Sequence, residues 1–167
     1  FNIFSNLTLS QFHRQDAVKL VVEPAARAGI SFEKAVPFIL QMAGHHPFYL
    51  QMACSALYEY LKDGAPLTPS LLEKARQDFL DEARVHFQQL WESCEPDRQE
   101  LLLLLAAGEP IPASRRFMVQ ELVRAGYVVM EKGKPRLFSA PMAEMILQAH
   151  GAKKGIRKKR KFLFWRF

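Results

Sequence analysis

The sequence predicts a mainly α-helical protein: a bundle of helices followed by a smaller helical part with one β-hairpin. Most of the chain places apolar residues three or four apart and interrupts them with glycine and proline, which is typical of amphipathic helices joined by turns. Only residues 127–139 contain two short β-prone runs around a glycine. With 167 residues, 49% hydrophobic and 24% charged, the chain can bury one or two small cores, which excludes disordered, collagen-like and disulfide-held proteins.

The basic character of the sequence comes from its C-terminal tail. The formal net charge is +6, but the tail that begins at Lys153 holds eight lysines and arginines, ending with Arg166, and no acid. The first 152 residues hold the other fifteen against seventeen acids and carry a charge of −2. Cys54 and Cys94 match no metal-binding or redox spacing, which suits a reducing compartment. We therefore expect a cytoplasmic protein.

The first two helices are expected on either side of a short turn. Ser10 is a suitable N-cap for the first helix, which should end at Pro24 because proline cannot continue the hydrogen-bond ladder. Ser31 is expected to cap the second helix, which should end at Gly44, a residue suited to the left-handed conformation of a helix C-terminus. Pro37 fits this helix only as a kink.

The next two helices are expected to be long. Residues 47–61 are apolar around almost the whole circumference, which indicates a buried helix. Thr68 is expected to cap the following helix, whose apolar residues keep helical spacing up to Trp91. A break is predicted in it near Asp81.

The remaining elements have the order helix, helix, hairpin, helix. Residues 98–107 contain five consecutive leucines and predict a central core helix that ends at Gly108. Ser114 is expected to cap a helix running to Ala125, followed by a hairpin with the three-residue connection 132–134 and a last helix over residues 141–150. In the helix expected between Ser114 and Ala125, the residues predicted to face inward are Phe117, Met118, Val119, Leu122 and Val123. Helix, helix and hairpin is the order of a winged helix.

The sequence lacks the common catalytic motifs. A phosphate-binding loop needs glycines before a Lys-Ser or Lys-Thr pair, whereas Gly133-Lys134 precedes Pro135 on the predicted hairpin. No His-Glu-x-x-His or Gly-x-Ser-x-Gly sequence is present, and no cluster has metal-ligand spacing. We expect that the chain alone catalyses no reaction.

The most distinctive local sequence joins two predicted helices at residues 44–47, Gly-His-His-Pro, which we call the His-Pro corner. Pro47 suits the first turn of a helix. The free N–H groups and positive dipole end of that helix favour an anion, and the proline ring offers an apolar surface for a base. The corner therefore fits a nucleotide, although spacing alone favours a purely structural helix-to-helix connection.

The sequence around the corner, Gly-His-His-Pro-Phe-Tyr-Leu-Gln over residues 44–51, resembles the C-terminal half of STAND-type ATPases of the AAA+ class. Leu9-Ser10 and Pro24 upstream and the stretch Phe-Gln-Gln-Leu-Trp-Glu over residues 87–92 belong to the resemblance, which spans about residues 3–148. In that family a Gly-Gly-His-Pro-aromatic motif in a helical lid brings its proline to the nucleotide, and a winged helix follows. The resemblance implies that Gly44, His46 and Pro47 are nucleotide-binding residues, with Gln51 matching the glutamine one turn later; His45 departs from the second glycine.

The resemblance also implies a domain organisation. Residues 1–9 would be the end of the last strand of an ATPase core, 10–81 the helical lid, 82–150 the winged helix and 151–167 a basic tail. ATP or ADP with Mg²⁺ would bind mainly to a phosphate-binding core upstream in the same polypeptide, which is the expected partner. No cofactor is expected for this chain by itself. The parent protein would be a nucleotide-dependent regulatory or signalling ATPase.

Two alternatives stay open. A winged helix can bind DNA through phosphate contacts, although only one helix fits between Gly108 and Gly126, where a DNA-reading winged helix usually has two. The candidate DNA-binding residues are Arg115, Arg116, Gln120, Arg124, Lys132, Lys134 and Arg136. The other alternative is a helical protein-interaction scaffold without a nucleotide.

The tail admits three interpretations: a solvated end, a contact with nucleic acid or an anionic membrane surface, or the cytoplasmic flank of a membrane helix beginning at Phe162. The chain opens at Phe1 without methionine and closes within an apolar run. We therefore expect a piece of a longer protein, cytoplasmic or at the cytoplasmic face of a membrane, with self-association as a further expectation.

Overall fold

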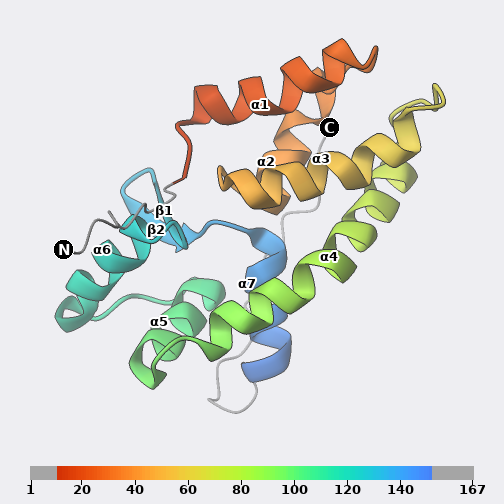
Figure 1. Ribbon diagram of the computed structural model, residues 1–167. Helices are drawn as coiled ribbons and strands as arrows, with labels where there is room; N and C mark the ends of the chain where they lie inside the picture. Colours follow the sequence, from red (N-terminus) through yellow and green to blue (C-terminus); the bar gives the residue numbers. More distant parts are fainter. Residues whose placement is uncertain (1–10, 152–167) are drawn as a thin grey trace, which may run out of the picture.

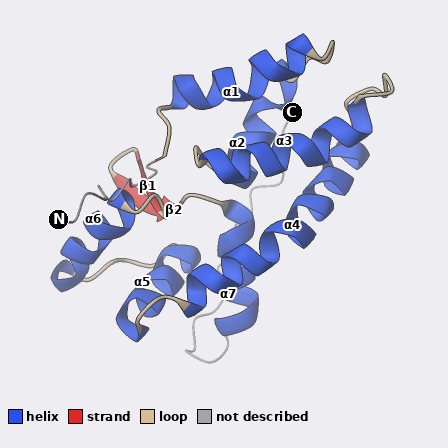
Figure 2. Ribbon diagram, viewed as in Figure 1, coloured by secondary structure: helices blue, strands red, loops and turns tan. Residues whose placement is uncertain are grey.

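The computed structural model describes residues 11–151 (Figure 1). Within them the protein is mainly helical with one small antiparallel hairpin (Figure 2), which confirms the predicted fold class. The α-helices are α1 (Arg14–Arg27), α2 (Val36–Ala43), α3 (Pro47–Leu61), α4 (Pro69–Glu92), α5 (Pro96–Ala107), α6 (Arg116–Arg124) and α7 (Ala140–His150), and the strands are β1 (Val128–Glu131) and β2 (Lys134–Leu137). Figure 1 shows α1, α2 and α3 at one end of the molecule and α5, α6 and the hairpin at the other, with α4 running between them.

The first helix differs from the prediction at both ends. Ser10 lies outside the described residues, and α1 begins at Arg14 with His13 at its N-cap. Pro24 does not end α1 but lies inside it. An interior proline removes one hydrogen bond of the ladder and crowds the preceding turn, yet α1 continues for three residues beyond it, with Ala25 buried and the Ala28 N–H bonded to the Pro24 and Ala25 carbonyls.

The start of the second helix was also predicted wrongly. A 3₁₀ turn, Glu33–Ala35, precedes α2, and no side chain caps either element, so Ser31 is not the N-cap. Pro37 lies in the first turn of α2, where its missing N–H has no intrahelical partner to lose. The expected kink is therefore a junction between a 3₁₀ turn and an α-helix.

The two central helices form largely as predicted. The bounds of α3 are those expected, and the Thr68 side chain accepts a hydrogen bond from the Leu71 N–H at 3.2 Å, which confirms the cap of α4. The predicted break near Asp81 is wrong: α4 is one helix of 24 residues. Its buried residues Phe79, Ala83 and Phe87 continue at helical spacing past this point, so nothing in the packing interrupts it.

One hydrophobic cluster runs through the described residues. Leu101, Leu102, Leu103 and Leu105 of α5 are buried in it, as expected for a core helix, and Gly108 ends α5 in the left-handed conformation. Helix α7 packs against α2, α4 and α5. Residue 81, the predicted boundary of the lid, therefore lies inside an uninterrupted helix, with cluster residues on both sides.

The region after α5 requires two corrections. Ser114 is not a cap but lies inside a second 3₁₀ turn, Ala113–Arg115, and no side chain caps α6. Phe117 does not face inward and is 62% exposed. It precedes the buried Val119 by two positions, about 200° around the helix axis, and thus lies on the opposite face from Val119 and Leu122.

The hairpin connection is one residue shorter than predicted. Glu131 pairs with Lys134, so only Lys132 and Gly133 form the turn, with φ angles of 49° and 75°. Two consecutive positive φ angles are the signature of a type I′ turn, whose twist matches that of a hairpin. The last predicted helix is confirmed as α7.

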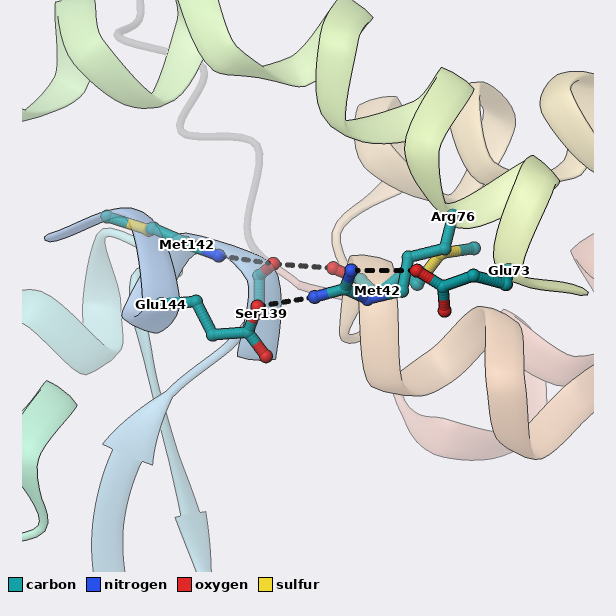
Figure 3. A network of polar contacts seen from close by, with 6 residues as sticks. All are labelled: Met42, Glu73, Arg76, Ser139, Met142 and Glu144. Carbon is teal, nitrogen blue, oxygen red and sulfur yellow. Dashed lines mark hydrogen bonds and ion pairs between the residues drawn. The ribbon is translucent and has the colours of Figure 1, made fainter. Parts of the chain in front are cut away.

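A polar network joins α7 to α2 and α4 (Figure 3). Buried Ser139 donates from Oγ to the carbonyl oxygen of Met42 in α2 at 2.5 Å and accepts from the Met142 N–H at 3.3 Å, which caps α7. Arg76 of α4 forms an ion pair with Glu144 of α7 and a second, at 3.5 Å, with Glu73. Contacts between residues 68 and 97 positions apart in the sequence thus hold α7 against α4 and α2.

Candidate functional site

The His-Pro corner begins at a glycine that the packing requires. Gly44 has φ 59° and ψ −135°: its φ is positive, as expected, but its ψ lies outside the predicted left-handed helical conformation. A Cβ atom at this position would lie 2.5 Å from the carbonyl oxygen of Phe138 and 3.2 Å from its Cβ. His45 needs no such conformation, because Lys132 is the one non-glycine residue with positive φ among residues 11–151. Gly44 therefore brings the corner against the segment that leads into α7.

His46 occupies the N-cap of α3 with a half-buried ring. The ring packs edge-on against Tyr49, with centroids 5.0 Å apart, and lies 5.8 Å from the ring of Phe138. Its Nδ1 atom is buried and has no hydrogen-bond partner. Burial lowers the pKa of His46 below the ordinary value of 6.5, so the neutral ring, with one donor and one acceptor nitrogen, is the favoured form at pH 7.

His45 connects the corner to the start of α1. Its carbonyl oxygen accepts from the Phe12 N–H at 3.0 Å. Burial is the main cause that lowers the pKa of the His45 ring, followed by the positive charges of Arg14 and Arg136, while a separate interaction of the ring with the backbone of Phe12 opposes the shift. Two arginines from distant parts of the chain therefore lie near the corner, and the local sequence gives no sign of either.

Three further segments meet behind the corner. The side chain of Gln11 donates to the carbonyl oxygen of Gly126, in the turn after α6. A Cβ atom on Gly126 would lie 3.8 Å from Cδ2 of His46. Phe138 and Ser139, before α7, contact the other side through the packing and hydrogen bond already described. The sequence did not predict that these residues lie near the corner, because they are far from it along the chain and belong to no recognisable motif.

The opposite side of the corner is the start of α3. Pro47 lies in the first turn and is half-buried, and no side chain caps the helix. Phe48 is exposed and packs edge-on against His86, with centroids 4.8 Å apart. The corner thus combines an unpartnered ring nitrogen, an apolar ring and the positive end of a helix dipole, a set that suits an anion carrying an aromatic group.

Comparison with protein families gives independent information about the function of the His-Pro corner. The model of the family described as novel STAND NTPase 2 matches residues 1–111. The chain belongs to this STAND NTPase family. The match confirms the resemblance to STAND-type proteins and includes the His-Pro corner. No curated protein and no solved structure matches the chain.

Four of the candidate DNA-binding residues of this STAND NTPase lie together. Arg116, Gln120, Arg124 and Lys134 line one groove between α6, the hairpin and the loop after α5. The other three are arranged differently: Arg115 is paired with Glu100 at 2.8 Å and Asp97 at 4.0 Å, Arg136 with Glu131 at 2.6 Å, and Lys132 lies in the hairpin turn.

The predictions about the tail from Lys153 and the segment before Ser10 fall outside the described residues. Among the helices of residues 11–151, none has the length and apolarity to cross a membrane.

The two corner histidines predict a pH dependence of stability. Because burial lowers both pKa values in the folded protein, the unfolded chain takes up protons near pH 6.5 that the folded chain does not. The free energy of unfolding should therefore fall as the pH falls from 7.5 through 6.5, until the folded-state pKa values are reached. Urea unfolding of the wild type and of His45→Asn/His46→Asn at constant ionic strength measures this, and a pH slope equal in both proteins would contradict it.

Proposed function

We propose that the chain is the helical lid and winged-helix part of a nucleotide-dependent STAND NTPase, a regulatory or signalling switch, and that its His-Pro corner forms one wall of the ATP or ADP site. The observation that carries the proposal is the buried, unpartnered Nδ1 of His46 at the start of an uncapped helix, in a chain of this family. An orphaned buried polar atom is costly unless another group completes it.

The chemical groups of the corner are of the types that bind a nucleotide. His46 offers a hydrogen-bonding nitrogen, Pro47 an apolar ring face for the base, and the first turn of α3 favours negative charge. Gly44 acts indirectly, because its contact with Phe138 keeps the corner in position. When ATP is bound with Mg²⁺, the phosphoanhydride supplies the bond to be hydrolysed, and we expect an upstream phosphate-binding core of the same polypeptide to hold it. This chain alone is expected to hydrolyse no ATP.

The switching part of the proposal rests on the contacts behind the corner. Gly44 against Phe138 and Ser139 against Met42 connect the corner to α7, and Arg76 pairs with Glu144 beside them. A displacement of the corner would therefore displace α7 and the hairpin as well. Two arrangements relative to the core that differ by a few kcal/mol are enough for nucleotide to select between them. We further propose a cytoplasmic location, including the cytoplasmic face of a membrane, and self-association in one of the two states.

The test is a pair of matched proline variants in the polypeptide that joins this chain to its upstream core. Pro47 and Pro96 both lie in the first turn of a helix, and Pro96 is exposed on α5, away from the corner. Pro47→Ala should weaken binding of a fluorescent ADP analogue about five- to tenfold, which corresponds to roughly 1–1.4 kcal/mol of lost contact. Pro96→Ala should leave the affinity unchanged.

Thermal unfolding of both variants shows whether either substitution changes the stability. Equal ADP affinity of Pro47→Ala and the wild type would contradict the proposal, as would a parent polypeptide that binds no nucleotide.

A further inference from the structure

The C-terminal part of the protein has a groove whose lining includes no residue of the His-Pro corner. It has a volume of about 910 Å³ and lies between the loop after α5, the side of α6 and the hairpin. Its apolar lining includes Ile111, Val119, Val123 and Met130. Met130 is 54% exposed, which leaves a flexible and polarizable apolar side chain available to a ligand.

The edge of the groove is positively charged. Arg116, Arg124 and Lys134 line it and are exposed, and none of the three forms an ion pair with a carboxylate within residues 11–151. Glu109 is the one acidic side chain in the lining. The neighbouring Arg115 and Arg136, by contrast, are neutralised by acids of the chain. The unpaired cations therefore surround apolar side chains instead of forming a solvated ion-pair network.

We propose that this groove binds an acidic amphipathic segment of a partner protein, with its apolar side chains against Met130 and Ile111 and its carboxylates against Arg116, Arg124 and Lys134. Charge complementarity selects the acids, because cations at the edge of an apolar surface attract and orient an oppositely charged segment. The hollow apolar lining selects the apolar residues, which gain contact area only in a concave site. The inference does not depend on nucleotide binding at the corner.

Other occupants fit these observations less well. The basic tail from Lys153 has the same sign of charge as the groove. Duplex DNA offers phosphates to the three cations but presents a convex charged surface that cannot fill an apolar groove. A strand added to β2 would find no N–H donor at Pro135, since proline lacks one.

The experiment is a selection of random 12-residue displayed peptides on the full 167-residue chain, followed by fluorescence anisotropy with the enriched peptides. We expect enrichment of peptides that combine Asp or Glu with Leu, Ile or Phe. Arg116→Glu/Arg124→Glu should weaken their binding by at least about tenfold, because attraction becomes repulsion at two positions. Lys19→Glu/Lys34→Glu makes the same change of net charge at exposed positions outside the groove and should leave the affinity within twofold.

A third variant, Met130→Ala, examines the apolar part of the groove and should also weaken binding several-fold without altering the folded state, since the side chain is mostly exposed. Failure to enrich any peptide, enrichment of peptides without acids, or equal loss in the two charge-reversal variants would overturn the proposal. A 20-base-pair duplex that binds through Arg116 and Arg124 while no peptide is selected would overturn it in favour of nucleic acid.

Discussion

Gly44→Ala is expected to destabilise the protein by about 3 kcal/mol or more, and to prevent folding if the wild type is of ordinary marginal stability. Two costs combine at this position. A non-glycine residue at positive φ costs about 1–2 kcal/mol, and the new Cβ would lie 2.5 Å from the Phe138 carbonyl oxygen, which is backbone and cannot move aside as a flexible side chain can. The free energy of unfolding, from urea titration followed by circular dichroism, measures the loss.

Gly64→Ala is the matched control. Gly64 has φ 80°, and an added Cβ would meet no atom within 4 Å. It therefore carries the backbone cost without the collision, and about 1–2 kcal/mol should be lost. The larger loss expected for Gly44→Ala comes from the contact between the corner and the residue before α7, together with any difference in backbone cost that arises from the ψ of −135° at Gly44. Equal losses for Gly44→Ala and Gly64→Ala would show that this contact is not made in solution.

Phe138→Ala is expected to cost about 3–5 kcal/mol, the range for removing a fully buried phenylalanine. Its ring lies among Tyr49 at 5.1 Å, Phe87 at 6.3 Å and His46 at 5.8 Å and is fully buried. Truncation would leave a cavity between α3, α4 and α7 and would also remove one wall of the pocket of His46. Thermal and urea unfolding measure the loss.

Phe117→Ala makes the same chemical change on the surface of α6, where the side chain is 62% exposed. A change within about 0.5 kcal/mol is expected, as for other surface substitutions. If Phe117→Ala proved as destabilising as Phe138→Ala, the inward orientation predicted from the sequence would be correct and the arrangement of α6 described above wrong.

Local chemistry explains which helices could be predicted. Pro47 and Thr68 start helices through their own ring or hydroxyl group, so the bounds of α3 and the cap of α4 follow from a few neighbouring residues. The end of α1 was mispredicted because proline usually stops a helix, whereas this helix continues through Pro24 with Ala25 buried in the core. Ser31 and Ser114 misled because a 3₁₀ turn occupies the place where a side-chain cap was expected.

The same distinction applies to the site. The Gly-His-His-Pro sequence identified the corner, and the family match supports its importance. The groups that surround it come from positions far along the chain: Gly126 and Phe138 are about 80 and 90 residues away. Periodicity and motifs cannot predict these contacts. The contacts depend on how α7 packs against α2 and α4, and no single segment of the sequence determines that packing.

The unbroken course of α4 limits how this molecule can change shape. A helix of 24 residues is a rod of about 36 Å at 1.5 Å per residue. It packs against α3 and α7, and its contacts with α7 extend from Arg76, paired with Glu144, to Trp91, stacked on His150. A continuous helix of this length has no internal break about which its two halves could rotate. If nucleotide moves the His-Pro corner as proposed, the hairpin end should move with it, with the internal geometry of residues 11–151 largely preserved.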